Sequence, residues 1–371
     1  MRVLYDHQIF EDQKFGGISR YFTELIKHNP LAELSIKYSD NIYLREEYFK
    51  KKKLCQLNYV YDNFFPNFSF RGKGRLFKYY TKLFKKDNRS ISIKHLKKSN
   101  FDVFHPTYFD PYFLEYLKNK PFVLTVHDMI YEIFPQYFLD DKITVPHKQC
   151  LIPKADAIIA VSENTKNDIL RFFPDLTEKI KVIYHGFYFQ QLSNKVKKEN
   201  YILFTGSRGR YKHFDAFVQA IAPLLIKYNL RLICTGESFN NNEKNLFDHL
   251  RITDRIIGKF ASDNELIKLY SEAIAFVFPS LYEGFGIPVL EAFASCCPAI
   301  ISNTSSLPEI GGDAAIYFDP YSIDDMRTQI DRVISSPALQ NEMIEKGKER
   351  IKQFSWKKCA EETMEVYKKL L

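Results

Sequence analysis

Short apolar segments that end in polar or glycine-containing clusters recur along the whole chain, and helical stretches separate them. In the first half, we predict strands at residues 3–5, 101–104, 122–126, 157–161 and 181–184. The pattern restarts after residue 200, with predicted strands at 201–205, 231–235, 275–278, 299–302 and 315–318. Continuous apolar strands of this kind are typical of parallel sheets that are covered on both faces, and such sheets bind ligands at the carboxyl ends of their strands.

The two runs of strands predict an α/β protein with two Rossmann-like, doubly wound domains that face a central cleft. A chain of 371 residues is also too long for one ordinary core and fits two domains. We place the first domain at 1–190 and the second at 191–353, with a polar linker without periodicity at 187–200. The final segment, 354–371, carries apolar residues at helical intervals, and we expect this helix to pack back on the first domain.

Composition narrows the class of protein. Apolar residues make up 45% of the chain and charged residues 26%, which are the proportions of a soluble globular protein. No run of about 18 apolar residues predicts a membrane-spanning helix, and the N-terminal segment lacks the features of a signal peptide. The six cysteines are scattered without C-x-x-C spacing, which favours free thiols in a reducing compartment. We therefore expect a cytoplasmic protein.

The net charge of +8 is concentrated in the basic region, residues 43–98, where sixteen Lys or Arg residues accompany four Asp or Glu residues. Aromatic residues are interleaved with these charges. Two explanations stay open: a solvated helical surface, or a face for an anionic membrane or a lipid-linked acceptor. The second predicts a peripheral protein on the inner face of the cytoplasmic membrane. Nucleic acid is not expected, because no recognised binding motif accompanies the charge.

The segment 279–291, P-S-L-Y-E-G-F-G-I-P-V-L-E, combines a glycine-containing turn with two carboxylates, Glu283 and Glu291. It follows an apolar strand and precedes a helical run. The first amides of a helix lack partners and carry the positive end of its dipole, so this turn is a suitable seat for phosphate. Carboxylates on both sides of such a seat suit the hydroxyls of a sugar or a ribose. The segment therefore predicts a nucleotide-sugar site.

Two cations follow the strand Y-I-L-F-T-G in the second half, Arg208 and Lys212. Together with free amides, they can stabilise the charge that develops on a departing diphosphate; a solvated loop is the alternative. Glu291 can accept both ribose hydroxyls, although a glutamate near a helix start is also favoured by the dipole. Glu283 precedes the turn, where a sugar attached to the diphosphate would project.

The first domain contributes glycines and a histidine. Gly16 and Gly17 follow the opening strand and allow a ligand close to the backbone, unless they form an ordinary tight turn. His127 ends the strand F-V-L-T-V, so we expect it to contact substrate rather than serve only the structure. His105 and His185 end neighbouring strands and are weaker candidates. No pair of aspartates is separated by one residue, so neither a metal nor another cofactor is implied.

With these motifs, the chain resembles retaining glycosyltransferases of the GT-B fold, of the family 4 (glycosyltransferase group 1) type. The resemblance is strongest at 201–320 and extends to F-G-G-I-S-R-Y-F, T-V-H-D, A-V-S-E-N-T and the terminal F-S-W helix. It departs from the family pattern at His213 and His185, where the family usually has asparagine, and at Cys296-Cys297, where the glycine usual before Pro298 is missing.

The resemblance implies roles for individual residues. Glu291 would bind the donor ribose, Arg208 and Lys212 the diphosphate, and Glu283 and His127 the transferred sugar. Gly17 would close over the donor. The amides of Phe285, Gly286 and Ile287 would contact sugar and phosphate, and the base would meet the backbone near Lys259 and Phe260.

The activity implied is transfer of a hexose, with retention, from a nucleotide diphosphate sugar to a glycan or lipid-linked acceptor. GDP-mannose is the first expected donor and a UDP-sugar the next. The setting implied is the synthesis of a bacterial surface polysaccharide such as O-antigen, lipopolysaccharide or capsule. A nucleotide-sugar epimerase of similar fold and a non-catalytic accessory subunit are the alternatives. The presence of both glutamates and both cations argues against a decayed site.

Overall fold

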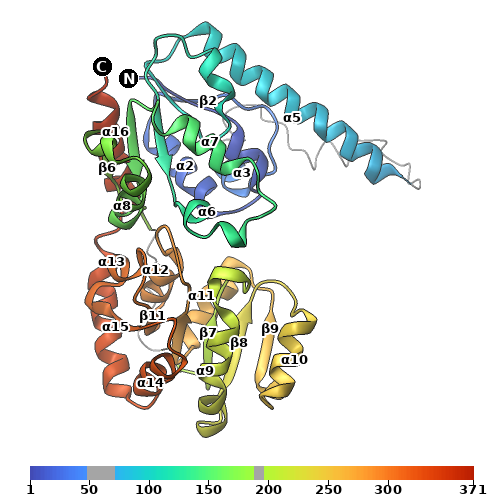
Figure 1. Cartoon of the computed structure of the whole chain (residues 1–371), viewed down its shortest axis with the longest axis vertical. Helices are drawn as coiled ribbons and strands as arrows, with labels where there is room; N and C mark the ends of the chain where they lie inside the picture. The colour runs from blue at the N-terminus through green and yellow to red at the C-terminus, as the bar shows by residue number, and fades with distance from the viewer. Residues whose placement is uncertain (48–71, 188–195) are drawn as a thin grey trace.

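The computed structural model describes residues 1–47, 72–187 and 196–371. Two lobes lie one above the other, and the N-terminal lobe carries both ends of the chain (Figure 1). Part of the basic region, 48–71, and part of the predicted linker, 188–195, fall outside the described residues. Within the described ranges, no helix is both long enough and apolar enough to cross a bilayer.

The N-terminal lobe is built on parallel strands. Three form a sheet in the order β2-β1-β3 and three form a sheet in the order β4-β5-β6. An isolated parallel bridge between Phe104 and Phe122 links the two sheets edge to edge. The strands are β1 (Val3–Tyr5), β2 (Ala32–Leu34), β3 (Val103–His105), β4 (Val123–Val126), β5 (Ala157–Ala160) and β6 (Ile180–Val182).

Helices cover both faces of these strands, because successive side chains of a strand point to opposite sides. Val3 and Tyr5 pack with α2 and with the C-terminal helix, whereas Leu4 packs in a second core that includes α7. The helices are α1 (Gln8–Asp12), α2 (Gly17–His28), α3 (Ile42–Glu47), α5 (Lys73–Lys98), α6 (Ile130–Ile133), α7 (Thr144–Leu151) and α8 (Glu163–Phe172).

The C-terminal lobe contains one parallel sheet of six strands in the order β12-β11-β10-β7-β8-β9. The order reverses between β7 and β10, so this is a doubly wound sheet whose switch point lies between those two strands. The strands are β7 (Tyr201–Phe204), β8 (Arg231–Thr235), β9 (Ile256–Lys259), β10 (Ala275–Phe278), β11 (Ala299–Ser302) and β12 (Ala315–Phe318).

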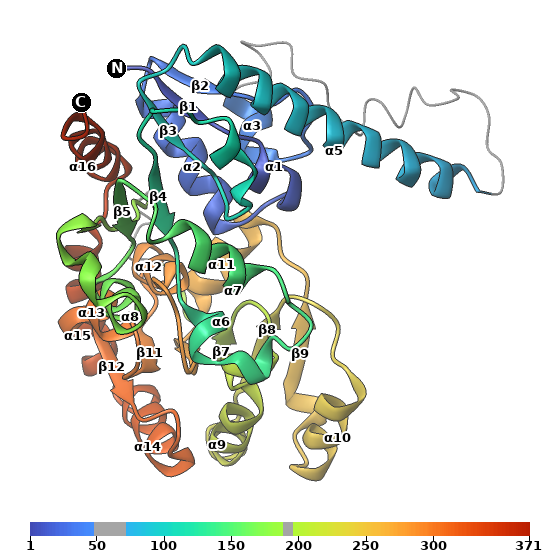
Figure 2. The ribbon, with the colours of Figure 1, turned by 45° about the horizontal axis from the view of Figure 1, so that its top comes forward.

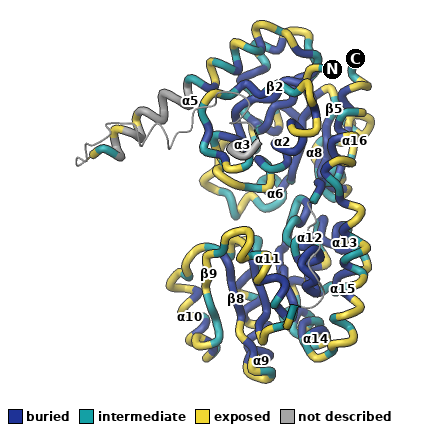
Figure 3. Tube along the Cα trace, turned by 180° about the vertical axis from the view of Figure 1, so that it is seen from behind, coloured by how far each residue is buried: buried dark blue, intermediate teal, exposed yellow. Residues whose placement is uncertain are grey.

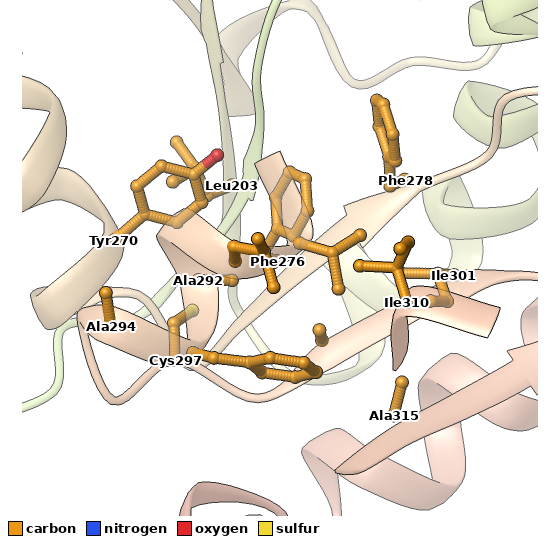
Figure 4. Close-up of a cluster of buried hydrophobic side chains, with 14 of the residues drawn as sticks. Leu203, Tyr270, Phe276, Phe278, Ala292, Ala294, Cys297, Ile301, Ile310 and Ala315 are labelled. Carbon is orange, nitrogen blue, oxygen red and sulfur yellow. The ribbon is translucent and has the colours of Figure 1, made fainter. Parts of the chain in front are cut away.

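Both faces of this sheet are buried, which explains why its strands read as continuous apolar runs. Phe276 and Phe278 belong to one core (Figure 4), while Ala275 and Val277 belong to the core on the other face. Most of the strands are buried inside each lobe, whereas the outer helices and the edge strand β9 carry exposed positions (Figure 3). The helices are α9 (Phe214–Lys227), α10 (Asn241–His249), α11 (Asp263–Glu272), α12 (Ile287–Ala294), α13 (Leu307–Gly311), α14 (Ile323–Ile334) and α15 (Pro337–Ile351).

The C-terminal helix α16 (Trp356–Lys368) packs on the N-terminal lobe, as predicted. Its Tyr367 is fully buried, and the Tyr367 hydroxyl lies 3.0 Å from the hydroxyl of Tyr5. The two segments that connect the lobes also touch: a Cβ at Gly186 would lie 2.1 Å from the backbone nitrogen of Trp356. The predicted fold class, with two doubly wound domains and a returning helix, is confirmed.

Candidate functional site

The loop 279–286 joins β10 to α12, and its carbonyl groups are held by hydroxyl donors. The hydroxyl of Ser306 lies 2.9 Å from the oxygen of Glu283 and 2.8 Å from that of Phe285. Between them, the oxygen of Gly284 accepts hydrogen bonds from two hydroxyls of the α8 segment, at 2.7 and 3.2 Å. Three successive carbonyls are thereby fixed on the side of α8 and α13.

Because a trans peptide unit is planar, each amide N–H points away from the carbonyl of its own unit. Among the described residues, none accepts a hydrogen bond from the amides of Phe285, Gly286 or Ile287. Gly286 adopts the left-handed conformation, with φ of 113°, which glycine accepts without strain. These amides lie at the start of α12, where the helix dipole is positive, so they form a seat that an anion can occupy.

Lys212 and Glu283 come together at this loop. The Nζ atom of Lys212 donates to a carboxylate oxygen of Glu283 at 2.5 Å, and both side chains are about six-sevenths buried, with exposures of 14% and 15%. The amide of Leu281 also donates to the carbonyl of Tyr211 at 2.8 Å, which ties the loop to the turn that carries the lysine. A cation and a carboxylate are thus placed beside the open amides.

The turn that presents Lys212 has a demanding backbone. Arg210 and His213, on either side of Tyr211 and Lys212, have φ angles of 58° and 54° although neither is glycine. Left-handed residues other than glycine are uncommon and occur most often where function fixes the backbone. The 3-10 turn Arg210–Lys212 leads directly into α9.

Arg208 lies elsewhere along the same edge of the sheet. Its Nε donates to Glu243 on α10 at 2.8 Å, and its Nη2 donates to the carbonyls of Glu237 and Ser238. The guanidinium also lies 4.6 Å from the centre of the Phe239 ring. The two predicted diphosphate ligands therefore have different partners in this structure: Lys212 contacts Glu283, and Arg208 contacts α10 and the loop before it.

The predicted base-binding positions end the edge strand β9. Lys259 and Phe260 are exposed, and Phe260 keeps 80% of its surface open. The carbonyl of Lys259 accepts a hydrogen bond from the amide of Gly236, next to the loop that holds Arg208. The backbone at 236–239 and at 259–260 thus shares one corner of the lobe, with an open aromatic ring beside it.

Glu291 is half-buried in the second turn of α12, since that helix begins at Ile287 and not at the glutamate. Burial raises the pKa of its carboxyl, whereas a hydrogen bond from the Tyr270 hydroxyl, at 3.1 Å, and the charge of Arg20 oppose that rise. Arg20 belongs to α2 of the N-terminal lobe. The charge of Arg20 therefore acts on the Glu291 carboxyl from the other lobe.

Gly16 and Gly17 lie at the start of α2: Gly16 is the cap residue and Gly17 is the first residue of the helix. A Cβ at Gly17 would meet no atom within 4 Å, so space is open beside it. A Cβ at Gly16 would lie 2.4 Å from the side-chain oxygen of Gln13. The fold does not require glycine at position 17 on steric grounds, which suits a position reserved for a ligand.

The predicted sugar contact, His127, belongs to a buried histidine cluster that also contains His105 and His185. The rings of His127 and His185 are stacked at 5.5 Å, and the Tyr21 ring meets both edge-on. Burial lowers the pKa of His127 and of His105 to about 3 and that of His185 well below its usual value. The Nε2 atom of His127 is buried and has no hydrogen-bond partner among the described residues.

Sequence reasoning missed three groups that border this site: Arg20, Tyr270 and Tyr282. Arg20 stands in the motif F-G-G-I-S-R, where its charge was a usable signal. The tyrosines belong to α11 and to the loop 279–286, and nothing in their spacing marks them. No group of three or more His, Cys, Asp or Glu side chains in the described part of the chain is arranged to hold a metal ion.

Comparisons with known proteins match both lobes. Residues 59–190 match the family described as Glycosyltransferase Family 4, and residues 189–350 match the family described as Glycosyl transferases group 1. The two matches adjoin where the chain passes from one lobe to the other.

Two relatives carry names that state an activity. The chain is 28% identical to O-antigen chain mannosyltransferase B of Escherichia coli over 289 aligned residues. The alignment covers 72% of this chain and 74% of the relative. It is 32% identical to O-antigen chain mannosyltransferase RfbU of Salmonella typhimurium over 209 aligned residues. That alignment covers 55% of this chain and 58% of the relative.

A solved structure shares the complete architecture. The HepE protein of Anabaena, in complex with UDP and glucose, aligns over 99% of both chains with a TM-score of 0.72 and 15% identity. A likeness at this identity concerns the fold alone. From the adjoining family matches and the two-lobe fold, we conclude that the chain is a glycosyltransferase with the GT-B fold and belongs to the family 4, or group 1, type.

Proposed function

We propose that this glycosyltransferase moves a hexose from a nucleotide diphosphate sugar to a glycan or lipid-linked acceptor, with GDP-mannose as the first candidate donor and a UDP-sugar as the next. The observation that carries the proposal is the Lys212–Glu283 pair beside the open amides of Phe285, Gly286 and Ile287. The names of the two bacterial relatives support mannose and the synthesis of O-antigen. We extend the proposal to bacterial surface polysaccharides of this kind, lipopolysaccharide and capsule included.

We propose retention of the anomeric configuration by reaction on one face of the sugar. The bond from the anomeric carbon to the diphosphate oxygen breaks, and the acceptor oxygen bonds to the same face of that carbon. The proton of the acceptor hydroxyl passes to the departing phosphate oxygen. Glu283 and His127 orient the sugar, and the Glu283 carboxylate stabilises positive charge at the anomeric carbon.

The leaving diphosphate then needs its own stabilisation. Lys212, Arg208 and the amides at the start of α12 supply it in this proposal, so that no resident metal or cofactor is required. The Glu291 carboxylate accepts hydrogen bonds from the ribose hydroxyls. Gly16 and Gly17 let the backbone at the start of α2 approach the donor. The base meets the backbone at Lys259 and Phe260.

The experiment that tests this function is a screen of nucleotide sugars with the purified protein and no acceptor. We expect GDP-mannose, or one UDP-sugar, to bind and to be hydrolysed slowly to the nucleoside diphosphate and the free sugar. An isomeric nucleotide sugar in the product would instead identify an epimerase. Failure of every nucleotide sugar to bind would favour an accessory subunit and contradict the proposal.

We also propose that the basic region brings the enzyme to the inner leaflet of the cytoplasmic membrane. Helix α5 projects beyond the rest of the N-terminal lobe (Figures 1 and 2), and its Leu76 and Tyr79 are 42% and 67% exposed. A projecting helix rich in lysine, with apolar side chains open to solvent, suits an anionic lipid surface.

Removing three lysines from α5 is expected to release the protein from anionic membranes. The triple change Lys82→Gln, Lys85→Gln, Lys86→Gln should weaken binding by about 10²-fold, because each lysine near an anionic leaflet contributes about 1 kcal/mol. The measurement is co-sedimentation with phosphatidylglycerol vesicles at low salt, with phosphatidylcholine vesicles for comparison. The control changes Lys346 in α15, Lys352 just after that helix and Lys357 in α16, whose side chains are exposed and lie outside the basic region. Equal binding by both triple variants would contradict the membrane role.

A further inference from the structure

One face of α8 carries three polar side chains that all contact the loop 279–286. Ser162 is the residue before the first turn, and Thr165 and Asp168 follow at intervals of three, so they share a face of the helix. The hydroxyls of Ser162 and Thr165 donate to the carbonyl of Gly284 at 2.7 and 3.2 Å. Asp168 accepts a hydrogen bond from the hydroxyl of Tyr282 at 2.7 Å. We call Ser162, Thr165 and Asp168 the α8 face.

These contacts fix the residues on both sides of Glu283. Tyr282 precedes it, and the Tyr282 hydroxyl also accepts a hydrogen bond from the amide of Met129 at 3.2 Å. Gly284 follows it and lies so close to the N-terminal lobe that a Cβ would come within 1.9 Å of the carbonyl oxygen of His127. The carboxylate proposed to face the sugar is thus held at both neighbours by the other lobe, beside the histidine proposed to share that sugar.

The α8 face is itself anchored to the C-terminal lobe. The carboxylate of Glu309 on α13 accepts hydrogen bonds from the amides of Glu163 and Asn164, at 2.7 and 3.2 Å, at the start of α8. Amides at a helix start attract a carboxylate because they lack partners and carry the positive end of the dipole. Water can satisfy each of these polar groups when the lobes part, so the contact suits reversible docking and not a permanent core.

We propose that the α8 face positions Glu283 for transfer, so that the carboxylate takes its working orientation only when the N-terminal lobe is docked on the loop. The inference rests on the proposed function of Glu283. Ser162, Thr165 and Asp168 contact the loop and are proposed to act through it, so they are positioning residues. The planar peptide gives a second effect: a fixed Gly284 carbonyl also directs the amide of Phe285 toward the anion seat.

Two variants test the proposal, Thr165→Val and Tyr282→Phe, with Thr165→Ser as the matched control. Each removes a hydroxyl that contacts across the lobes and keeps the shape of the side chain, whereas serine restores the hydroxyl. We expect kcat to fall about tenfold in both variants, because a small misplacement of a reacting group has effects of this size. We expect the Kd for GDP or UDP, measured by calorimetry, to stay within about twofold, since ground-state binding is retained.

Amide hydrogen exchange in the loop gives a readout that needs no donor. In both variants, exchange of the Leu281 and Glu283 amides, which donate to Tyr211 and Ser305, should become about fivefold faster or more, because undocking opens the loop locally. Thr165→Ser should match the unchanged protein in exchange and in kcat. Unchanged loop exchange in both folded variants would overturn the positioning role. An equal loss of kcat in Thr165→Ser, which keeps the hydroxyl, would overturn it as well. If the unchanged protein turns over no nucleotide sugar, the proposed function fails, and the exchange comparison still decides whether the α8 face holds the loop.

Discussion

Purified Glu283→Gln protein is expected to bind its donor nucleotide as tightly as the unchanged protein and to transfer the sugar about 10²–10³ times more slowly. Glutamine keeps the shape of the side chain and an oxygen that can accept from Lys212, which now lies 2.5 Å from the carboxylate. It lacks the negative charge. The positive charge at the anomeric carbon develops only in the transition state. Removing the negative charge that stabilises it therefore lowers kcat far more than it weakens donor binding.

Arg208→Ala provides the contrasting variant. It should weaken the binding of GDP or UDP by about tenfold or more, because a hydrogen bond to a charged group contributes roughly 1.5–3 kcal/mol. The change also removes the ion pair to Glu243 and can lower the stability of the variant. Calorimetry should therefore be done well below the melting temperature of the variant. If Glu283→Gln turned over normally, or if it lost nucleotide binding in proportion to kcat, the assigned division between the sugar end and the nucleotide end would be wrong.

The buried strands of the C-terminal lobe could be predicted almost to the residue. The structure gives 231–235, 275–278, 299–302 and 315–318 the bounds that their apolar runs predict, because a strand buried on both faces must be apolar throughout. The two strands that were missed, β2 (Ala32–Leu34) and β9 (Ile256–Lys259), are sheet edges with half-exposed or exposed residues. Both carry a charged residue, Glu33 or Lys259, that interrupts the apolar run, whereas the other edge strand of the larger sheet, β12, is A-I-Y-F and keeps the signal.

The candidate site shows the same division. The loop 279–286 could be predicted from its glycines and from the apolar strand before it. Its amides lie at the start of α12, as a glycine-containing turn between a strand and a helix predicts. The pairing of side chains could not be read, because Lys212 meets Glu283 and Arg208 meets Glu243 only through the packing of distant elements. Ser162 and Thr165 were visible in A-V-S-E-N-T, but a serine before a helix is explained fully as a cap, so nothing in the motif indicated a contact with the other lobe.

The buried histidine cluster is expected to make the fold sensitive to acid. Lowering the pH from about 7.5 to about 5 should reduce the free energy of unfolding by roughly 2 kcal/mol for each of His105, His127 and His185. Burial lowers the pKa of the first two to about 3 and that of His185 well below its usual value, so all three stay neutral in the folded protein. The unfolded chain binds these protons as the pH falls through about 6.5, and stability is lost as the pH falls.

Three half-buried carboxyls act in the opposite direction. Burial raises the pKa of Glu132, Asp168 and Glu291, so the folded protein gains these protons first as the pH falls, which favours the fold. The folded protein takes up these protons between the raised pKa values and the usual values near 4, so the three carboxyls offset part of the histidine effect. A combined loss of roughly 6 kcal/mol is comparable with the whole stability of many domains, which makes this one of the largest effects expected.

His185→Asn isolates one member of the cluster, and urea unfolding at several pH values measures its effect. Asparagine cannot titrate, so the slope of unfolding free energy against pH should decrease by about 1.4 kcal/mol per unit below pH 6.5. His249→Asn is the matched control, because His249 is exposed at the end of α10 and lies outside the cluster. An equal slope for His185→Asn and the unchanged protein would mean that His185 already takes up its proton in the folded state. That result would contradict a cluster kept neutral by burial.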